Sequence, residues 1–258
     1  MEYPWNINLI LFPFMMLATR VGALVMTLPM MAGQFVPMRA RLFLTLGISI
    51  VGFPMISQYT QFDIQKLNVA EMFLIFSQQI LIGICFSFVV QILFQAFSMA
   101  AEACAMQMGL GFASMVDPLS GVSVPTLSQF YIMLVSLLFL SFNGHLYIMQ
   151  AIMESFHRFP LGVLDLRVFD LASVIQTSRW IFIHGFQIAL PAITAILMVN
   201  ITISIMTRAT PQLNIFSIGF PITMILGFII IWFMTGTILP GFQSLSDRII
   251  TFLHGWGY

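Results

Sequence analysis

The residues of this chain that could carry chemistry are a few charged side chains inside or beside long apolar segments. They are Arg20, Glu102, Arg179 and Arg208. An unpaired charge at bilayer depth costs at least about 2.5 to 3.5 kcal/mol, so each needs a partner or a route to water. A proton or ion relay needs several titratable groups along one path, and Glu102 is isolated. We therefore expect Arg20, Glu102 and Arg208 to form ion pairs between helices, or the arginines to reach the membrane surface.

The histidines and cysteines are also isolated. His145 and His184 have no neighbouring ligand residues, and Cys85 and Cys104 form no CxxC pattern. We expect the histidines to be hydrogen-bonded inside the protein and the cysteines to pack as small apolar residues. The sequence thus predicts no metal site, no disulfide and no cofactor.

Signatures of membrane enzymes are absent from the sequence. There is no HExxH for a metalloprotease, and GVSVP at Gly121–Pro125 lacks the second glycine of a serine elbow. Asp117 has no second membrane-embedded aspartate with which to share a proton. No GxxxxGK[ST] phosphate loop occurs either. We therefore expect neither an enzyme nor a nucleic-acid-binding protein.

The elements that must position these residues are membrane helices. The chain is 60% hydrophobic and 7% charged, with a formal net charge of zero. The ranges Met72–Ala101 and Pro118–Met153 carry no charged residue. Because about 20 apolar residues span the bilayer core as a helix, both can cross it. The acidic start MEYPWNIN, without a small-residue cleavage pattern, predicts no cleaved signal peptide.

The pattern predicts an all-α, polytopic membrane protein with about six long, kinked hydrophobic helices arranged as hairpins. A split near Asn143 and Gly144 is expected in the fourth helix, and an amphipathic tail follows the sixth. This tail either lies on the membrane surface, packs on a partner or frays. The expected helices cover residues 8–33, 42–57, 69–105, 126–156, 171–206 and 215–239.

A Gly/Pro/Ser-rich break interrupts this pattern at Met106–Pro125, between two segments long enough to span. Irregular backbone leaves N–H and C=O groups that lipid cannot satisfy, so at membrane depth it must be buried in protein or line a watery cavity. Something therefore surrounds or fills this loop.

Three strings together resemble the FliR family, the R subunits of the flagellar type III export gate. They are MQMGLGFASMVDP at Met106–Pro118, FNGHL at Phe142–Leu146 and TPQLNIFSIGFP at Thr210–Pro221. The resemblance covers nearly the whole chain. It implies one membrane domain at 1–258, with a P-subunit-like portion at about 1–170 and a Q-subunit-like helical hairpin and tail at about 171–258.

The resemblance also implies partners and a place in the cell. It suggests a bacterial inner-membrane, multi-pass component of the flagellar basal body that forms a pore with FliP and FliQ, alongside FlhA and FlhB. Unfolded flagellar proteins would cross this pore as transient substrates. No nucleotide motif supplies the driving force, so it must come from elsewhere in the machine.

In this family the loop at Met106–Gly121 is implied to project into the channel as a plug. The residue types suit the task, because glycine permits unusual backbone geometry, methionine repacks around different substrates, and a hydrophobic constriction blocks ions by dewetting. Static packing of the loop against its neighbours is the alternative. The expected plug residues are Met106, Met108, Gly109, Gly111, Phe112, Met115, Asp117 and Pro118.

Three other functions stay open. The nearest rival is an R-subunit homologue in a virulence type III secretion system, although MGLGFASMVDP fits the flagellar pattern better. A small-solute transporter or channel would need broken helices in corresponding halves and polar groups meeting at the midplane. A purely structural scaffold would show no leak when the loop is cut.

Overall fold

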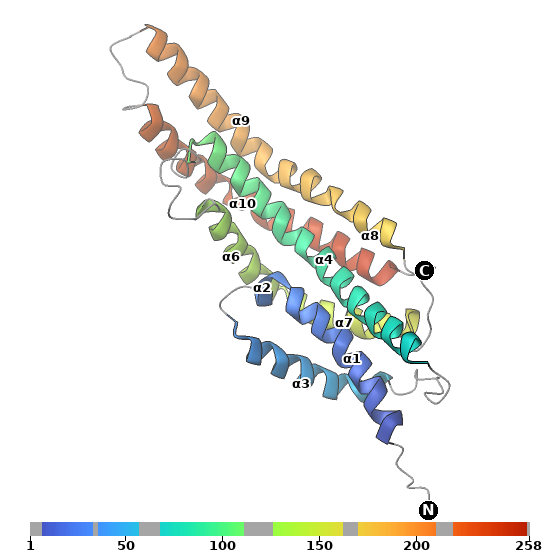
Figure 1. Ribbon diagram of the computed structural model, residues 1–258. Helices are drawn as coiled ribbons and strands as arrows, with labels where there is room; N and C mark the ends of the chain where they lie inside the picture. The colour runs from blue at the N-terminus through green and yellow to red at the C-terminus, as the bar shows by residue number, and fades with distance from the viewer. Residues whose placement is uncertain are drawn as a thin grey trace, which may run out of the picture. The chain divides into compact units, whose positions relative to one another are not determined.

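The computed structural model describes residues 7–32, 36–56, 68–110, 126–161, 170–209 and 219–256. All regular elements in these ranges are helices (Figure 1). They are α1 (Ile7–Thr27), α2 (Pro29–Ala32), α3 (Met38–Ile56), α4 (Val69–Gln107), α6 (Thr126–Ser141), α7 (Gly144–Arg158), α8 (Leu171–Thr177), α9 (Arg179–Ala209) and α10 (Phe220–Gly255).

The lengths of these helices confirm the predicted class. In the described ranges four spans are long and apolar enough to cross a membrane: Ile10–Thr27, Met38–Ile56, Val69–Gln107 and Leu171–Ala209. The number rises to 6 if each of two bent helix pairs counts as one span. The chain is therefore an all-α, polytopic membrane protein.

The split predicted in the fourth helix is present. α6 ends at Ser141 and α7 begins at Gly144, with Asn143 between them at φ 56°. Asparagine is one of the few residues other than glycine that adopts this left-handed conformation readily. The residue types at the break therefore account for its position.

The proline at position 240 does not end the last helix, so the predicted end at Leu239 is wrong. α10 contains Pro240 and continues to Gly255. Pro13 and Pro191 likewise lie inside α1 and α9. Proline is tolerated in membrane helices because neighbouring groups satisfy the freed backbone carbonyls. The amphipathic tail is therefore part of α10 rather than a separate element.

Contacts divide the chain into two compact units, with boundaries inside α4 and α10, between α6 and α7, and between α8 and α9. Unit 1 comprises residues 1–91, 142–177 and 248–258, and unit 2 comprises residues 92–141 and 178–247. These units reflect packing rather than likeness to other subunits. The division near residue 170 into P-like and Q-like portions stays a prediction.

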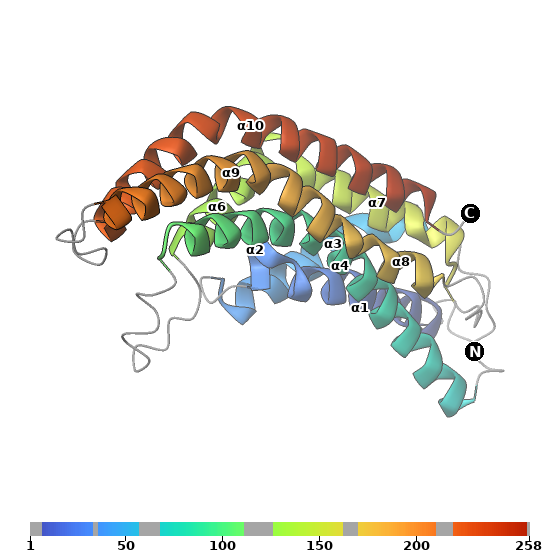
Figure 2. The same ribbon diagram turned by 90° about the horizontal axis from the view of Figure 1, so that it is seen from above.

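In unit 1, α1 lies beside α3 in both views (Figures 1 and 2). α1 also packs closely on α4 at Gly83, where an added Cβ would lie 2.4 Å from the Arg20 carbonyl oxygen and 2.7 Å from the Ala23 Cβ. Small residues allow helices in membranes to approach this closely. The end of α10 packs through Trp256, whose ring centroid lies 5.4 Å from those of Phe86 and Phe159.

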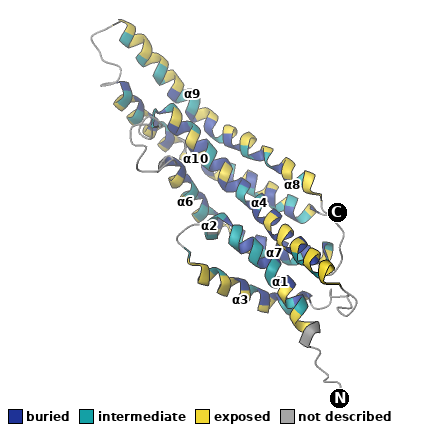
Figure 3. Ribbon diagram, viewed as in Figure 1, coloured by how far each residue is buried: buried dark blue, intermediate teal, exposed yellow. Residues whose placement is uncertain are grey.

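In unit 2, α4 packs against other helices through aromatic rings and small residues. The ring centroids of Phe94 and Phe139 are 5.8 Å apart, and those of Phe97 and Phe242 are 6.5 Å apart. Gly185 of α9 lies over α4, since a Cβ there would be 3.1 Å from the Ala96 carbonyl oxygen. Much of α9 is nevertheless exposed (Figure 3).

Candidate functional site

The segment predicted to form the plug starts from a well-defined helix end. The Leu110 N–H donates to the Ala105 carbonyl and the Gly109 N–H to the Met106 carbonyl, each at 3.0 Å. Gly109 has φ 82°. This bond pair with a left-handed glycine is the Schellman motif, which closes a helix by satisfying its last carbonyls. α4 therefore ends at Gln107, so Met106, the first residue of the predicted segment, still belongs to the helix.

Two other helices of unit 2 hold this end of α4. The Asn200 side chain of α9 donates to the Gln107 carbonyl oxygen at 3.1 Å. Met108 is 1% exposed and packs on Gly227 of α10, where an added Cβ would lie 2.5 Å from the Met108 Cγ. Asn200 and Gly227 were not identified from the sequence, because no local pattern links them to a segment so distant along the chain.

The predicted plug residues fall into separate groups. Met106 is 64% exposed, whereas Met108 is buried and helps to fix the end of α4. Gly109 forms the turn. The others, Gly111, Phe112, Met115, Asp117 and Pro118, lie outside the described residues. The plug role of the whole set stays a prediction.

Arg20 is fully buried, and its guanidinium joins three parts of unit 1. Its Nε donates to the Gln79 Oε1 at 2.7 Å, its Nη1 to the Ser155 Oγ at 2.9 Å and its Nη2 to the Phe159 carbonyl oxygen at 2.8 Å. The guanidinium carbon also lies 3.7 Å from the centroid of the Phe156 ring. Each of these acceptors is neutral, and the cation–π contact adds to them.

The Arg20 contact with Phe159 has a clear electrostatic cause. Phe159 is the C-cap of α7, and the C-terminal end of a helix carries partial negative charge. A cation placed there satisfies a terminal carbonyl and complements the helix dipole. Arg20 thus fixes the end of α7 against α1 and α4.

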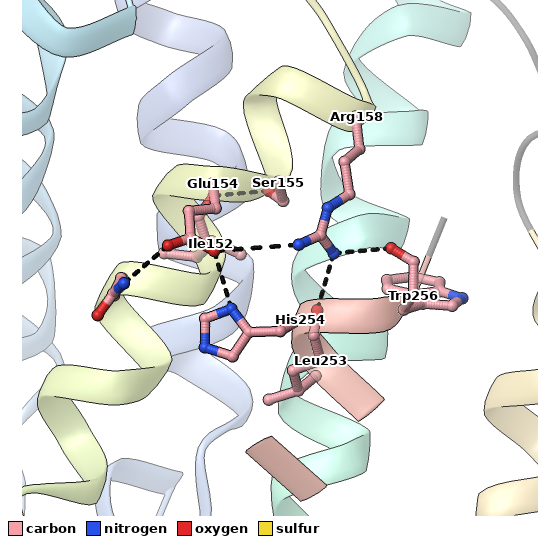
Figure 4. Close-up of polar contacts among 8 residues, drawn as sticks. Ile152, Glu154, Ser155, Arg158, Leu253, His254 and Trp256 are labelled. Carbon is pink, nitrogen blue, oxygen red and sulfur yellow. Dashed lines mark hydrogen bonds and ion pairs between the residues drawn. The ribbon is translucent and has the colours of Figure 1, made fainter. Parts of the chain in front are cut away.

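A second arginine caps the C-terminal end of another helix in the same way (Figure 4). The Arg158 Nη1 donates to the carbonyl oxygens of Leu253 and Trp256, each at 2.9 Å. The Leu253 carbonyl belongs to the last turn of α10, and the Trp256 carbonyl lies just after it. Arg158 therefore caps α10 from the last residue of α7.

Glu154 completes this cluster at the end of α10. Its Oε2 lies 2.8 Å from the His254 Nδ1 and 3.9 Å from the Arg158 Nη2, while its Oε1 accepts from the Gln150 side chain at 2.7 Å. Figure 4 shows Glu154 between these groups. This cluster was not predicted from the sequence, although the four-residue spacing of Gln150, Glu154 and Arg158 places them on one helix face.

Glu102 and Arg208 differ from Arg20, because both are exposed. Within the described ranges neither forms an ion pair. The ion pairing predicted for Arg20, Glu102 and Arg208 therefore stays a prediction. Cys85 and Cys104 are buried and free, and the described residues include no group of His, Cys, Asp and Glu that could hold a metal ion.

A groove lies between α3 and α7 in unit 1. Its volume is about 870 Å³. One wall is apolar, and the other carries a polar row formed by Gln150, Glu154 and His157. The lining residues include Gly47, Val51, Met55, Met149 and Met153.

Comparisons with known proteins agree with this architecture. The model of the family "bacterial export proteins, family 1" matches residues 11–249. The flagellar biosynthetic protein FliR of Escherichia coli K12 is 35% identical over 247 residues, covering 96% of this chain and 92% of that protein. The FliR of Buchnera aphidicola subsp. Schizaphis graminum is 30% identical, covering 96% and 95%. The FliR of Pectobacterium carotovorum is 31% identical, covering 91% and 88%.

These matches run through α1 to α10, including both helices that flank the predicted plug and the arginine-capped end of α7. Since the family model covers far more than half of the sequence, the chain belongs to the bacterial export proteins of family 1, with FliR-type flagellar proteins as its relatives.

Proposed function

We propose that the chain is a subunit of the flagellar type III protein export gate. The observation that carries this proposal is the full-length match to FliR-type flagellar proteins, together with a polytopic helical fold. The flagellar names of these relatives favour this role over the virulence-type alternative. A small-solute transporter is less well supported, because one long break and few polar groups do not form a paired midplane site.

In this role the chain resides in the bacterial inner membrane, in the flagellar basal body. It assembles with FliP and FliQ into a pore and works beside FlhA and FlhB. Unfolded flagellar proteins are the transient substrates. The exposed apolar side chains of α9, such as Phe182 and Met198, support such an assembly, because they must contact either lipid or another subunit.

The segment at 106–121 acts as the plug of this pore. Two observations support the assignment. The segment leaves α4 at a turn that Asn200 and Gly227 hold in place, so its starting point is fixed. The side chains that follow include Phe112 and Met115, which can fill a constriction and exclude water.

Conductance of the purified complex in a planar bilayer tests the plug. Phe112→Gly with Met115→Gly removes bulk from the segment but leaves α4 and its anchored end intact. We expect the assembled variant complex to conduct small ions, whereas the complex with the unchanged segment stays closed. Phe43→Ala with Met38→Ala, at exposed positions of α3, is the control for loss of large apolar side chains, and this complex should stay closed.

The outcomes separate the subunit role from the plug role. An assembled but electrically silent variant would mean that the seal lies in another subunit. If the unchanged chain failed to copurify with P-type and Q-type subunits, the gate-subunit proposal itself would be wrong.

A further inference from the structure

Several polar groups of α4 have hydrogen-bond partners within the chain, although the buried Gln78 Oε1 and Ser87 Oγ have none in the described residues. Gln79 accepts from Arg20 at 2.7 Å, and Gln91 donates to the Thr27 carbonyl oxygen at 2.8 Å. The Gln107 carbonyl oxygen accepts from Asn200 at 3.1 Å. Polar residues of a membrane helix are expected to be paired in this way, because lipid offers no hydrogen bonds.

One edge of α4 in unit 2 departs from this rule. Gln95, Glu102 and Met106 are all exposed, and their spacing of seven and four residues places them on one face of the helix. In the described part of the chain, no hydrogen bond or ion pair is made by the side chains of Gln95 and Glu102. We call these three residues the α4 edge.

The α4 edge is narrow. Phe94, Ala96, Ala101 and Ala105, which lie beside it in sequence, are each 2% exposed or less. Ser98, Met99, Ala103 and Gln107 are half-buried, so the fully exposed part of α4 in unit 2 is a narrow strip with a half-buried margin. Such a strip fits the ridge of one further helix, whereas the wall of an aqueous passage would expose a broader polar surface.

The side chains of the α4 edge indicate which residues the partner helix must carry. A carboxylate facing lipid costs at least about 2.5 to 3.5 kcal/mol, and an opposite charge removes most of that cost. The Gln95 amide can form a hydrogen bond to a neighbouring helix, and Met106 can adapt to its shape. An arginine or lysine opposite Glu102 is the matching group, because no such residue in the described ranges lies within ion-pair distance of it.

We propose that the α4 edge docks a membrane helix of another gate subunit, which places a lysine or arginine against Glu102. This inference rests on the proposed function, since the partner is a subunit of the same assembly. It deepens that function by locating one contact surface and by stating the charge that recognises it.

Site-specific photocrosslinking locates the partner helix. A benzophenone amino acid at position 95, in the full chain expressed with the other gate subunits, should crosslink to one subunit at a segment that contains a lysine or arginine. The same probe at position 232, where Trp232 is 76% exposed on α10, controls for general contacts. Crosslinks to lipid or to a second copy of this chain would overturn the proposal.

Charge variants then test the pairing itself. Glu102→Lys should reduce the amount of copurified complex about tenfold and Glu102→Gln by less, because breaking a buried pair leaves an uncompensated charge. Glu71→Gln, at the exposed start of α4, is the matched control. It should have no effect, because glutamine can still accept from the Asn68 N–H as Glu71 does at 3.0 Å.

Reversing the charge of the partner residue distinguishes loss of the ion pair from misfolding of the Glu102→Lys variant. Replacing the crosslinked lysine or arginine by glutamate should restore complex formation to Glu102→Lys and not to the unchanged chain. If Glu102→Lys assembles normally, Glu102 faces water and the pairing is wrong, although the gate role stands. If the unchanged chain does not copurify with other subunits, the gate role fails instead.

Discussion

The Glu154 Oε2 lies 2.8 Å from the His254 Nδ1, although the two residues are 100 positions apart in the chain. Together with the Arg158 bonds to Leu253 and Trp256, this contact attaches the end of α10 to α7. Electrostatics rather than apolar packing alone therefore determines where the C-terminal segment lies in unit 1.

Arg158→Ala should destabilise the protein by about 2 kcal/mol, because the buried guanidinium makes charged hydrogen bonds to two carbonyls that would lose their donor. Arg158→Lys should cost less but still be measurable, since an ammonium cannot reproduce the planar guanidinium. Thermal unfolding of the detergent-solubilised complex measures both. Arg39→Ala, at an exposed position of α3, should be neutral, and an equal loss there would argue against the capping role.

Arg20→Leu should be more damaging than Arg158→Ala, at about 3 to 5 kcal/mol. The leucine cannot donate, so Gln79, Ser155 and the Phe159 carbonyl would lose their common partner. Arg39→Leu, on the exposed start of α3, provides the control. Proteolysis of the membrane-embedded protein would detect the loss of stability. Similar resistance of both variants would show that Arg20 does not stabilise unit 1.

Gly83→Ala should destabilise unit 1 by about 1 to 3 kcal/mol, because the new methyl group would meet the backbone of α1. A backbone oxygen at 2.4 Å cannot move aside as a flexible side chain can. Gly236→Ala is the matched change, since no atom lies within 4 Å of its added Cβ. It should stabilise α10 by about 0.5 to 1 kcal/mol through helix propensity. Opposite shifts of the two melting temperatures are expected.

Trp256→Ala should release the C-terminal segment, because Trp256 packs on Phe86 and Phe159 and its Nε1 donates to the Asp170 carbonyl oxygen at 3.3 Å. Removing a buried aromatic side chain costs about 3 to 5 kcal/mol. Trp232→Ala, at a position 76% exposed, should cost far less. Limited proteolysis near residue 256 would report the release, and unchanged protection would contradict it.

Asp170 predicts a pH dependence at the start of α8. The Asp170 carboxylate accepts from the Ser173 hydroxyl and, at 3.0 Å, from the Ser173 N–H, and these bonds lower its pKa. A lowered folded-state pKa means that the contribution to stability is present above the ordinary aspartate value of about 3.9. It is lost as the pH falls below that value through the lowered pKa.

Asp170→Asn isolates this contribution, because asparagine caps helices without titrating. The difference in melting temperature between the two proteins should therefore change only in the acid range. A constant difference from neutral pH to pH values below the ordinary aspartate pKa would show that the carboxylate does not stabilise α8.

The sequence predicts the helices better than it predicts their contacts. The break at Asn143 follows from a residue that adopts left-handed backbone, and the span of α4 follows from its uncharged run. The end of α10 was misplaced because Pro240 is a helix breaker in water but is tolerated in a membrane helix. These outcomes depend on local chemistry, which a sequence displays directly.

The candidate site depends on contacts between distant residues. Arg20 stands out as a charge in an apolar segment, yet its acceptors lie 59, 135 and 139 positions away. Nothing near Arg20 in the sequence identifies Gln79, Ser155 or Phe159. Glu154 and His254 also escaped notice, because each looks like an ordinary charged residue of an amphipathic helix.

The return of residues 248–258 to unit 1 has a consequence for how the chain is made. Translation proceeds from the N-terminus, so α1, α3 and α7 enter the membrane well before Trp256 is synthesised. Until translation ends, the carbonyls that Arg158 caps and the imidazole that Glu154 contacts are missing. A chain that is terminated early therefore exposes an unfilled surface on its first unit, which would mark incomplete products for proteolysis before they reach an assembly.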